Sequence, residues 1–208
     1  MQRMIRKRLT REDSRDQTTQ RLLAAAQRLF AKKGLAGTSV EDITAAAGYS
    51  RGAFYSNFGG KHDLFIELLR RDHAAATAEL ASLARDDLSL DQIQSRVRHL
   101  YSSLYRDNEN FMTWTEARML GARDAKFRAK LNALISEKRE QVAAFITYFY
   151  QRAGIPPPLA PTAAAMGFMS LIEGVKLFML SSPVDTADTA ESTLAFFIDS
   201  FMQMGRHK

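Results

Sequence analysis

The sequence predicts an all-α protein of about nine helices, arranged as a small N-terminal domain and a larger C-terminal domain. Apolar residues recur every three or four positions along most of the 208-residue chain, and no segment alternates as a β-strand does. Glycine and proline are concentrated between these segments, most densely in GIPPPLAP at 154–161, where proline prevents a helix from continuing. We expect helices at 15–33, 40–47, 51–57, 61–84, 90–106, 110–121, 125–153, 162–180 and 187–204.

The stretch 38–61, TSVEDITAAAGYSRGAFYSNFGGK, predicts two short helices joined by a tight turn, with a third helix following. Thr38 is expected to cap the first helix, and Glu41 three residues later to complete a capping box. Gly48 suits a left-handed turn that most side chains disfavour. Ser50 can cap the next helix by accepting a hydrogen bond from a free backbone N–H. This layout is that of a helix-turn-helix DNA-binding motif.

The helix at 51–57 has two different faces. Phe54 and Phe58 are four residues apart, so one face is expected to be buried. The other face carries cationic, small, hydroxyl and amide groups, which can approach a groove closely and bind phosphates or base edges. The residues expected to contact DNA are Thr38, Ser39, Ser50, Arg51, Gly52, Ala53, Tyr55, Asn57 and Lys61.

Arg51 and Lys61 each fall in the first turn of a predicted helix. The helix dipole disfavours a cation there by a few tenths of a kcal/mol to about 1 kcal/mol. A bound phosphate would reverse this effect, because the dipole and the side chain would then attract it together. We therefore expect both residues to bind DNA phosphates.

The basic residues are concentrated at the N-terminal end. Residues 1–61 hold 12 Lys and Arg against 5 Asp and Glu, a net charge of +7, whereas residues 62–208 hold 17 against 18. Such an excess is typical of a domain that binds a polyanion. Residues 1–13 form a basic arm that we expect to be disordered. The arm either follows the minor groove or backbone of DNA or acts only as a solubilising tail.

Three segments of the first domain resemble the DNA-binding domain of the TetR family of transcriptional regulators: LFAKKG (29–34), TSVEDITAAAGYS (38–50) and RGAFYSNFGGKHDLF (51–65). In that family the segment similar to 50–58 is the recognition helix, and the residues similar to Tyr55 and Lys61 hold phosphates. The resemblance covers 17–65. It implies a DNA-binding domain at 14–60, a regulatory and dimerisation domain at 61–208, and a homodimer that represses transcription.

Other classes of protein are disfavoured. The chain has no cysteine, which excludes disulfides, thiol catalysis and cysteine-based zinc sites. Its four histidines show no metal-binding or catalytic spacing, and no phosphate-binding glycine loop or nucleophile elbow is present, so we expect no enzyme, cofactor or metal. The apolar segment 163–180 carries Glu173 and Lys176, which are costly in lipid. We expect it to be a buried helix of a cytoplasmic protein.

The last two predicted helices indicate a homodimer. The helix at 162–180 is apolar on nearly every side, and a chain of this size can cover only one of its faces. The final helix carries an apolar stripe at helical spacing. We expect these helices to form a four-helix bundle with those of a second copy, through Met166, Phe168, Val175, Phe178, Leu194, Phe197, Ile198 and Phe201. The alternative is a purely internal core.

Aromatic and methionine side chains in the middle helices suit a pocket for an apolar or aromatic ligand. The candidate lining residues are Phe111, Trp114, Glu116, Met119, Phe145, Phe149, Met169 and Glu173. Each of these residues can equally belong to an ordinary core, and the alternative role of Glu173 is an ion pair with Lys176 on the same helix.

The sequence thus predicts a regulator that binds double-stranded DNA as a homodimer, at a palindromic operator, and that a small hydrophobic or aromatic effector releases. The alternative is a DNA-binding regulator without such an effector, controlled by a protein partner.

Overall fold

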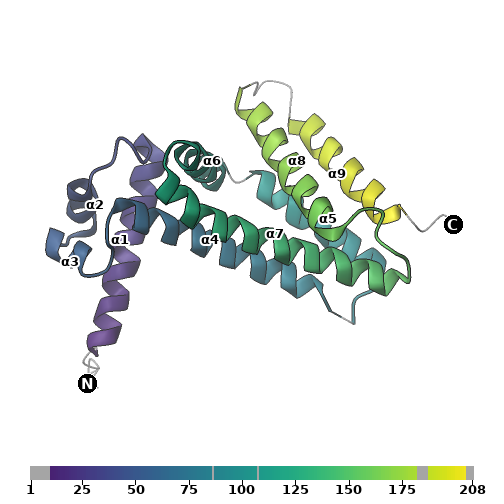
Figure 1. The fold of residues 1–208 in the computed structure, drawn as a ribbon, viewed down its shortest axis with the longest axis horizontal. Helices are drawn as coiled ribbons and strands as arrows, with labels where there is room; N and C mark the ends of the chain where they lie inside the picture. The colour runs from purple at the N-terminus through teal and green to yellow at the C-terminus, as the bar shows by residue number, and fades with distance from the viewer. Residues whose placement is uncertain (1–9, 86, 107, 182–186, 205–208) are drawn as a thin grey trace, which may run out of the picture. The chain divides into compact units, whose positions relative to one another are not determined.

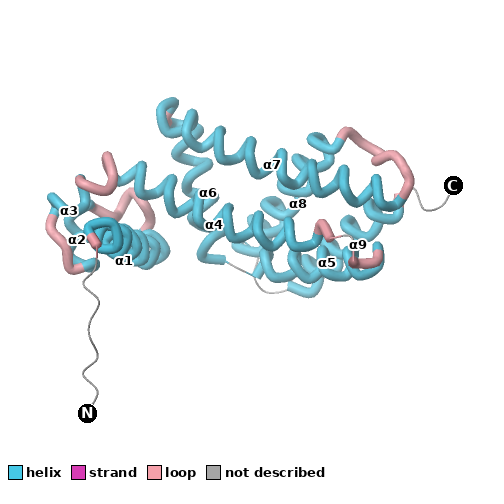
Figure 2. Tube along the Cα trace, turned by 90° about the horizontal axis from the view of Figure 1, so that it is seen from below, coloured by secondary structure: helices cyan, strands magenta, loops and turns pink. Residues whose placement is uncertain are grey.

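The computed structural model describes residues 10–85, 87–106, 108–181 and 187–204. Within these ranges it contains nine helices and no strand (Figures 1 and 2). The helices are α1 (Arg11–Lys33), α2 (Val40–Ala47), α3 (Arg51–Tyr55), α4 (Lys61–Leu83), α5 (Leu90–Arg106), α6 (Asn108–Arg123), α7 (Ala125–Ala153), α8 (Pro161–Ser181) and α9 (Ala187–Gln203). The all-α prediction is confirmed, and no predicted helix boundary is displaced by more than four residues.

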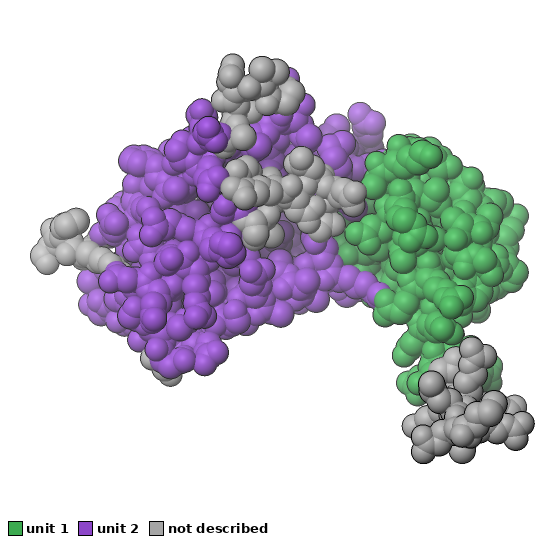
Figure 3. All heavy atoms as spheres, turned by 180° about the vertical axis from the view of Figure 1, so that it is seen from behind, with its two compact units in different colours: residues 1–69 green, residues 70–208 purple. Residues whose placement is uncertain are grey.

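The chain divides into two compact units, residues 1–69 and 70–208, which Figure 3 colours separately. The division falls within α4, so that helix contributes residues 61–69 to the first unit and 70–83 to the second. The sequence instead predicted a domain boundary at residue 60, immediately before α4 begins. The described portion of each unit has its own buried apolar residues.

The first unit is a small helical bundle in which α2 lies against α1 and α3 against α2. Phe30 of α1 and Phe65 of α4 meet edge to face, with ring centroids 5.3 Å apart. Gly37 lies in the loop between α1 and α2, where an added Cβ would stand 2.4 Å from the carbonyl oxygen of Lys33. That close approach explains why only glycine fits at this position.

The helix α1 begins earlier than the sequence predicts. Thr10 accepts a hydrogen bond from the backbone N–H of Asp13, and the Asp13 carboxylate accepts one from the backbone of Thr10, at 3.0 and 2.9 Å. This capping box starts the helix at Arg11. Residues 10–13 of the predicted disordered arm are therefore ordered, and residues 1–9 lie outside the described part of the chain.

The second unit packs α7 against α6 and α8, and α9 against α5 and α8 (Figure 1). Its core joins residues that are far apart in sequence, including Ile93, Val97, Phe149, Tyr150 and Ile198. The hydroxyl of Tyr150 donates a hydrogen bond to the carbonyl oxygen of Phe201 and so ties α7 to α9. The long helix α7 begins at the cap Asp124 and ends at the left-handed Gly154, before the proline-rich run.

The helix α8 is only partly buried by its own chain. Ala164, Ala165 and Lys176 are buried, whereas Met166 and Phe178 are exposed. By length and composition, α8 is the one helix among the described residues that could cross a membrane. Only 17% of its most apolar 18-residue stretch is buried. The expectation of a buried helix therefore holds for one face of α8 alone.

Candidate DNA interface and ligand pocket

The cap of α2 is Ser39, one residue after the predicted Thr38. Ser39 accepts a hydrogen bond from the backbone N–H of Asp42 at 3.0 Å, and the Asp42 carboxylate accepts one from the backbone of Ser39 at 2.8 Å. Lys33 also donates to Asp42 at 2.8 Å, and this bond is the largest cause of the lowered pKa of that carboxyl. The prediction of a Thr38–Glu41 capping box was wrong.

Thr38 is turned into the first unit. Its side chain is 1% exposed, and its hydroxyl donates a 2.7 Å hydrogen bond to the carbonyl oxygen of Gly34. A buried hydroxyl with an internal acceptor cannot reach DNA in this conformation. Thr38 therefore does not belong to the surface on which the other predicted DNA contacts were expected.

The turn between α2 and α3 has the predicted geometry. Gly48 adopts the left-handed conformation, with φ 74° and ψ 32°. Ser50 caps α3 by accepting a hydrogen bond from the backbone N–H of Ala53 at 3.2 Å. Phe54 and Phe58 are buried as predicted, which fixes the opposite face of α3 toward solvent.

The solvent face of α3 presents Arg51, Gly52, Tyr55 and Ser56. Tyr55 is 50% exposed, and Arg51 lies 6.0 Å from the centroid of its ring. Arg51 also pairs with Glu41 at 2.9 Å, where both side chains are more than half exposed. Because an exposed pair contributes at most about 1 kcal/mol, Arg51 can exchange Glu41 for a phosphate at little cost.

The Asn57 side chain makes hydrogen bonds within the protein that the sequence did not predict. Its amide nitrogen donates to the carbonyl oxygen of Ala53 at 2.7 Å and to Ser56 Oγ at 3.3 Å. Its Oδ1 accepts a hydrogen bond from the hydroxyl of Thr19 on α1 at 3.0 Å. The Asn57 side chain thus anchors the end of α3 to α1, and base reading by this amide would require those bonds to break.

Lys61 also has internal partners. Its ammonium donates to the carbonyl oxygens of Leu35 and Thr38, at 2.7 Å in each case. These bonds hold the start of α4 to the loop between α1 and α2. The position that the sequence assigned to phosphate binding therefore has a structural role in this conformation.

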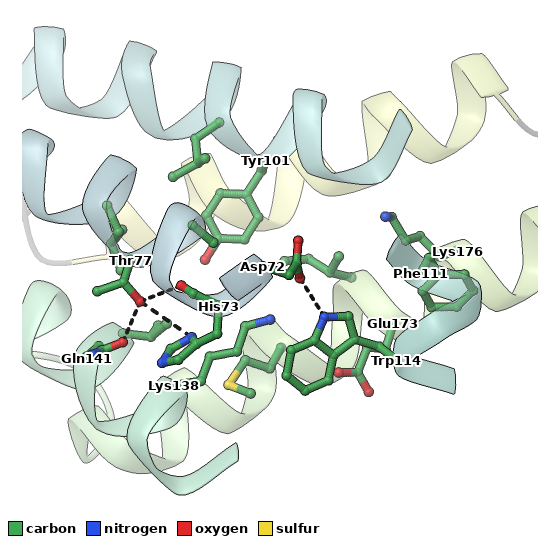
Figure 4. Close-up of a pocket in the computed structure, with 16 residues that line it drawn as sticks. Asp72, His73, Thr77, Tyr101, Phe111, Trp114, Lys138, Gln141, Glu173 and Lys176 are labelled. Atoms are coloured by element: carbon green, nitrogen blue, oxygen red, sulfur yellow. Dashed lines mark hydrogen bonds between the residues drawn. The ribbon is translucent and has the colours of Figure 1, made fainter. Parts of the chain in front are cut away.

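The second unit contains a cavity of about 130 Å³ between α4, α5, α6, α7 and α8 (Figure 4). Its apolar wall includes Phe111, Trp114 and Met169, and its polar groups include Lys138 and Glu173. Sixteen residues line it: Asp72, His73, Ala76, Thr77, Leu80, Leu100, Tyr101, Phe111, Trp114, Lys138, Gln141, Val142, Met169, Ile172, Glu173 and Lys176.

Hydrogen bonds order the polar side chains of this cavity. The indole N–H of Trp114 donates to Asp72 at 2.6 Å, and Arg118 pairs with Glu173. Glu173 of α8 thus pairs with a residue of α6. Thr77 Oγ lies 2.7 Å from Gln141 Oε1, which joins α4 to α7.

Burial changes the titration of several lining groups. Desolvation lowers the pKa of His73, and the positive charge of Lys138 lowers it further. The pKa of Lys138 is also lowered, chiefly by desolvation, against the opposing attraction of Asp72 and Glu173. Burial raises the pKa of Tyr101 to about 12, so its hydroxyl is a neutral donor and acceptor at physiological pH.

Half of the predicted pocket residues line this cavity, namely Phe111, Trp114, Met169 and Glu173. Glu116 does not, because it is two residues from Trp114 and so lies on the opposite side of the helix. Met119 is half exposed and also lies outside the lining.

Phe145 and Phe149 line a separate cavity of about 30 Å³. They lie one and two turns after Gln141 on α7. Five polar residues of the main cavity were not predicted from the sequence: Asp72, His73, Tyr101, Lys138 and Gln141. The only sequence signal for these residues was the presence of polar groups on otherwise apolar helix faces.

The predicted dimer residues fall into three groups: exposed, buried and partly buried. Met166, Phe178 and Phe197 are exposed, with Phe178 at 74%. Leu194 and Ile198 are 3% and 2% exposed and belong to the core of their own chain, so they cannot contact a second copy. Phe168, Val175 and Phe201 are partly buried. The exposed apolar surface also includes Leu177 and Phe196, which were not among the predicted dimer residues.

Residues 22–68 match the family model of bacterial regulatory proteins, tetR family. The HTH-type transcriptional repressor AcnR of Corynebacterium efficiens is 28% identical over 170 residues, which cover 76% of this chain and 89% of that protein.

Two solved structures have the same fold. One is a protein of Saccharomonospora viridis described as a transcriptional regulator, in complex with choline. It is 21% identical with a TM-score of 0.71, covering 88% of this chain and 96% of that one. The other is the transcriptional regulator FadR of Bacillus subtilis in complex with stearoyl-CoA. It is 17% identical with a TM-score of 0.70, covering 86% and 96%. The first unit thus matches the tetR family of bacterial regulatory proteins over residues 22–68, and the chain as a whole shares the all-α fold of the two solved regulators.

Proposed function

We propose that this protein is a cytoplasmic transcriptional repressor that binds a near-palindromic operator as a homodimer and leaves it when a small molecule occupies the cavity of the second unit. The observation that carries this proposal is the presence, in one chain, of an exposed recognition helix and a cavity with ordered polar groups.

The face of α3 supports DNA binding. Arg51 and Tyr55 are exposed, as are Ser39 and Ser50, which cap the N-terminal ends of two helices, where phosphate binding is favoured. The first unit holds 12 Lys and Arg against 7 Asp and Glu, whereas the second holds 17 against 16. The basic excess therefore belongs mainly to the unit that carries α3.

The exposed apolar side chains of α8 and α9 support a homodimer. Met166, Leu177, Phe178, Phe196 and Phe197 would remain in water in a monomer. A patch of large exposed apolar side chains is typical of an interaction surface. A two-fold partner would cover them and would present two recognition helices to two half-sites.

The helix α4 supports control of DNA binding by a ligand. Residues Asp72, His73 and Thr77 of α4 line the cavity, and Leu64 and Phe65 of the same helix belong to the core of the first unit. A ligand that prefers one conformation of α4 would change DNA affinity by no more than the size of that preference. The choline and stearoyl-CoA complexes of related folds support a small-molecule effector, although their ligands differ from each other.

Selection of bound DNA from a random pool tests this function. We expect enrichment of a near-palindrome with half-sites about 34–36 Å apart, or a multiple of that spacing. A single enriched half-site would contradict the homodimer, and no enrichment would contradict sequence-specific binding. If no small molecule weakened binding to the selected DNA, control by a protein partner would replace the effector in this proposal.

A further inference from the structure

The Lys138 ammonium is the most unusual group in the cavity. It carries three N–H donors, yet among the described residues it has no hydrogen-bond acceptor and no carboxylate within 4.0 Å. Its nitrogen lies 4.8 Å from the centroid of the Trp114 ring. Figure 4 shows the side chain extending between His73 and Trp114. Lys138 is partly buried and lines the cavity, so its unpaired N–H donors favour a ligand that supplies an acceptor.

The groups that would attract a cationic ligand are already engaged. Lys138 covers the face of Trp114, and Lys176 lies 5.3 Å from the centroid of Phe111. The carboxylate of Asp72 accepts the indole N–H, and the carboxylate of Glu173 pairs with Arg118. A cation in this cavity would also stand beside the like charge of two lysines. Both arguments favour an anion.

The volume and walls of the cavity suit a small apolar body. A dry cavity of about 150 Å³ holds one benzene ring, and this cavity is about 130 Å³. Its walls include Leu80, Leu100, Val142, Met169 and Ile172, which suit an apolar body.

Accepting the proposed effector-binding function, we propose that the ligand is a small organic acid with an apolar body of about one ring, whose carboxylate accepts hydrogen bonds from Lys138. The acid enters as its anion, and Trp114 and Phe111 pack against its body.

Three probes that share a phenyl ring test the charge: benzoate, the neutral benzamide and the cationic benzylamine. Trp114 is the single tryptophan of the chain and lines the cavity, so its fluorescence reports binding directly. We expect benzoate to bind at least about tenfold more tightly than benzamide, because a hydrogen bond to a charged group is stronger than a neutral one.

Substitutions at Lys138 identify the group responsible. Lys138→Met should remove the preference for benzoate over benzamide, and Lys138→Arg, which keeps the charge, should retain part of it. Lys126→Met is the matched control, because Lys126 is an exposed lysine of the same helix outside the cavity lining. Thermal unfolding of each variant shows whether it remains folded.

The ligand class is wrong if benzamide or benzylamine binds as tightly as benzoate, if the preference survives Lys138→Met, or if none of the three probes binds. Binding of the selected DNA, followed by fluorescence anisotropy, separates this result from the proposed function. A neutral or cationic probe that releases DNA would leave the proposed function standing and overturn the anion. Benzoate that binds through Lys138 without changing DNA affinity would support the anion and contradict the effector role.

Discussion

Lys61 has the sequence position of a phosphate-binding residue, yet its ammonium binds acceptors within the protein. The sequence places it at the start of a helix, where a phosphate would stabilise it. In the structure its ammonium instead donates to the carbonyl oxygens of Leu35 and Thr38. Two of its three donors thus have protein acceptors, and the phosphate role that family resemblance implies remains a prediction.

Lys61→Met should therefore lower the free energy of unfolding as well as weaken DNA binding. Two carbonyl oxygens would lose a charged donor, and we expect a loss of about 1–3 kcal/mol, measured by chemical denaturation. Lys32→Met, which removes an exposed lysine of α1, is the control. If Lys61 also binds a phosphate, the slope of log K against log salt should become shallower by about one. An unchanged slope would limit Lys61 to its structural role.

His73 should make the protein less stable in mild acid. Its pKa is lowered in the folded chain, so below about 6.5, the ordinary value, the unfolded chain binds a proton that the folded chain does not. The contribution of His73 to the free energy of unfolding is therefore fully present above that pH. It is lost as the pH falls toward the lowered pKa.

We expect thermal unfolding of the wild type to move to lower temperature between pH 7.5 and 5.5, and His73→Gln to show a smaller change. Equal pH dependence in the two proteins would contradict this assignment.

At the scale of a helix, the start of α2 was ambiguous from the sequence alone. Thr38 with Glu41 and Ser39 with Asp42 have the same three-residue spacing. Two tertiary contacts decide between them: Thr38 is buried against Gly34, and Lys33 holds Asp42 in place.

Ser39→Ala should consequently destabilise the first unit by ~1 kcal/mol, because the backbone N–H of Asp42 loses its acceptor. Glu41→Ala, which removes the acid of the rejected pair, should change stability little, since Glu41 makes only an exposed ion pair with Arg51. Thermal unfolding of both variants is the measurement. A larger loss of stability for Glu41→Ala than for Ser39→Ala would instead support the Thr38–Glu41 capping box.

The apolar stripe of α9 shows the same limit. Leu194, Phe197, Ile198 and Phe201 recur at helical spacing, which predicts an apolar face without saying what covers it. Leu194 and Ile198 turn toward the core of their own chain, whereas Phe196 and Phe197 turn to solvent. The spacing therefore identified the helix correctly but assigned two core residues to the dimer surface.

For the molecule as a whole, the exposed surface of α8 and α9 predicts that association and folding can be separated by mutation. Phe178→Ser should weaken self-association by roughly a hundredfold or more, because each copy loses a large apolar side chain from a symmetric interface. Its monomer should still fold, since Phe178 is exposed. Leu194→Ala should instead cost about 2–5 kcal/mol of folding stability.

Sedimentation measures the association of these variants, and thermal unfolding measures their stability. Unchanged association of Phe178→Ser would exclude this residue from the interface.

The number, order and approximate ends of the helices were predictable from the sequence, as were Gly48, Ser50 and the burial of Phe54 and Phe58. These features depend on residues within one or two turns of each other, so local spacing is enough to specify them. The family resemblance was likewise carried by a nearly continuous stretch.

Only the tertiary structure decided which polar groups meet. Asp72, Trp114 and Lys138 come from three helices, and their contacts depend on how those helices rotate and cross. Helical spacing fixes which residues share a face of one helix, but it carries no information about the face presented by another helix. The sequence by itself thus determined the helices and the DNA-reading motif, and the packing of α4, α6 and α7 decided the chemistry of the cavity.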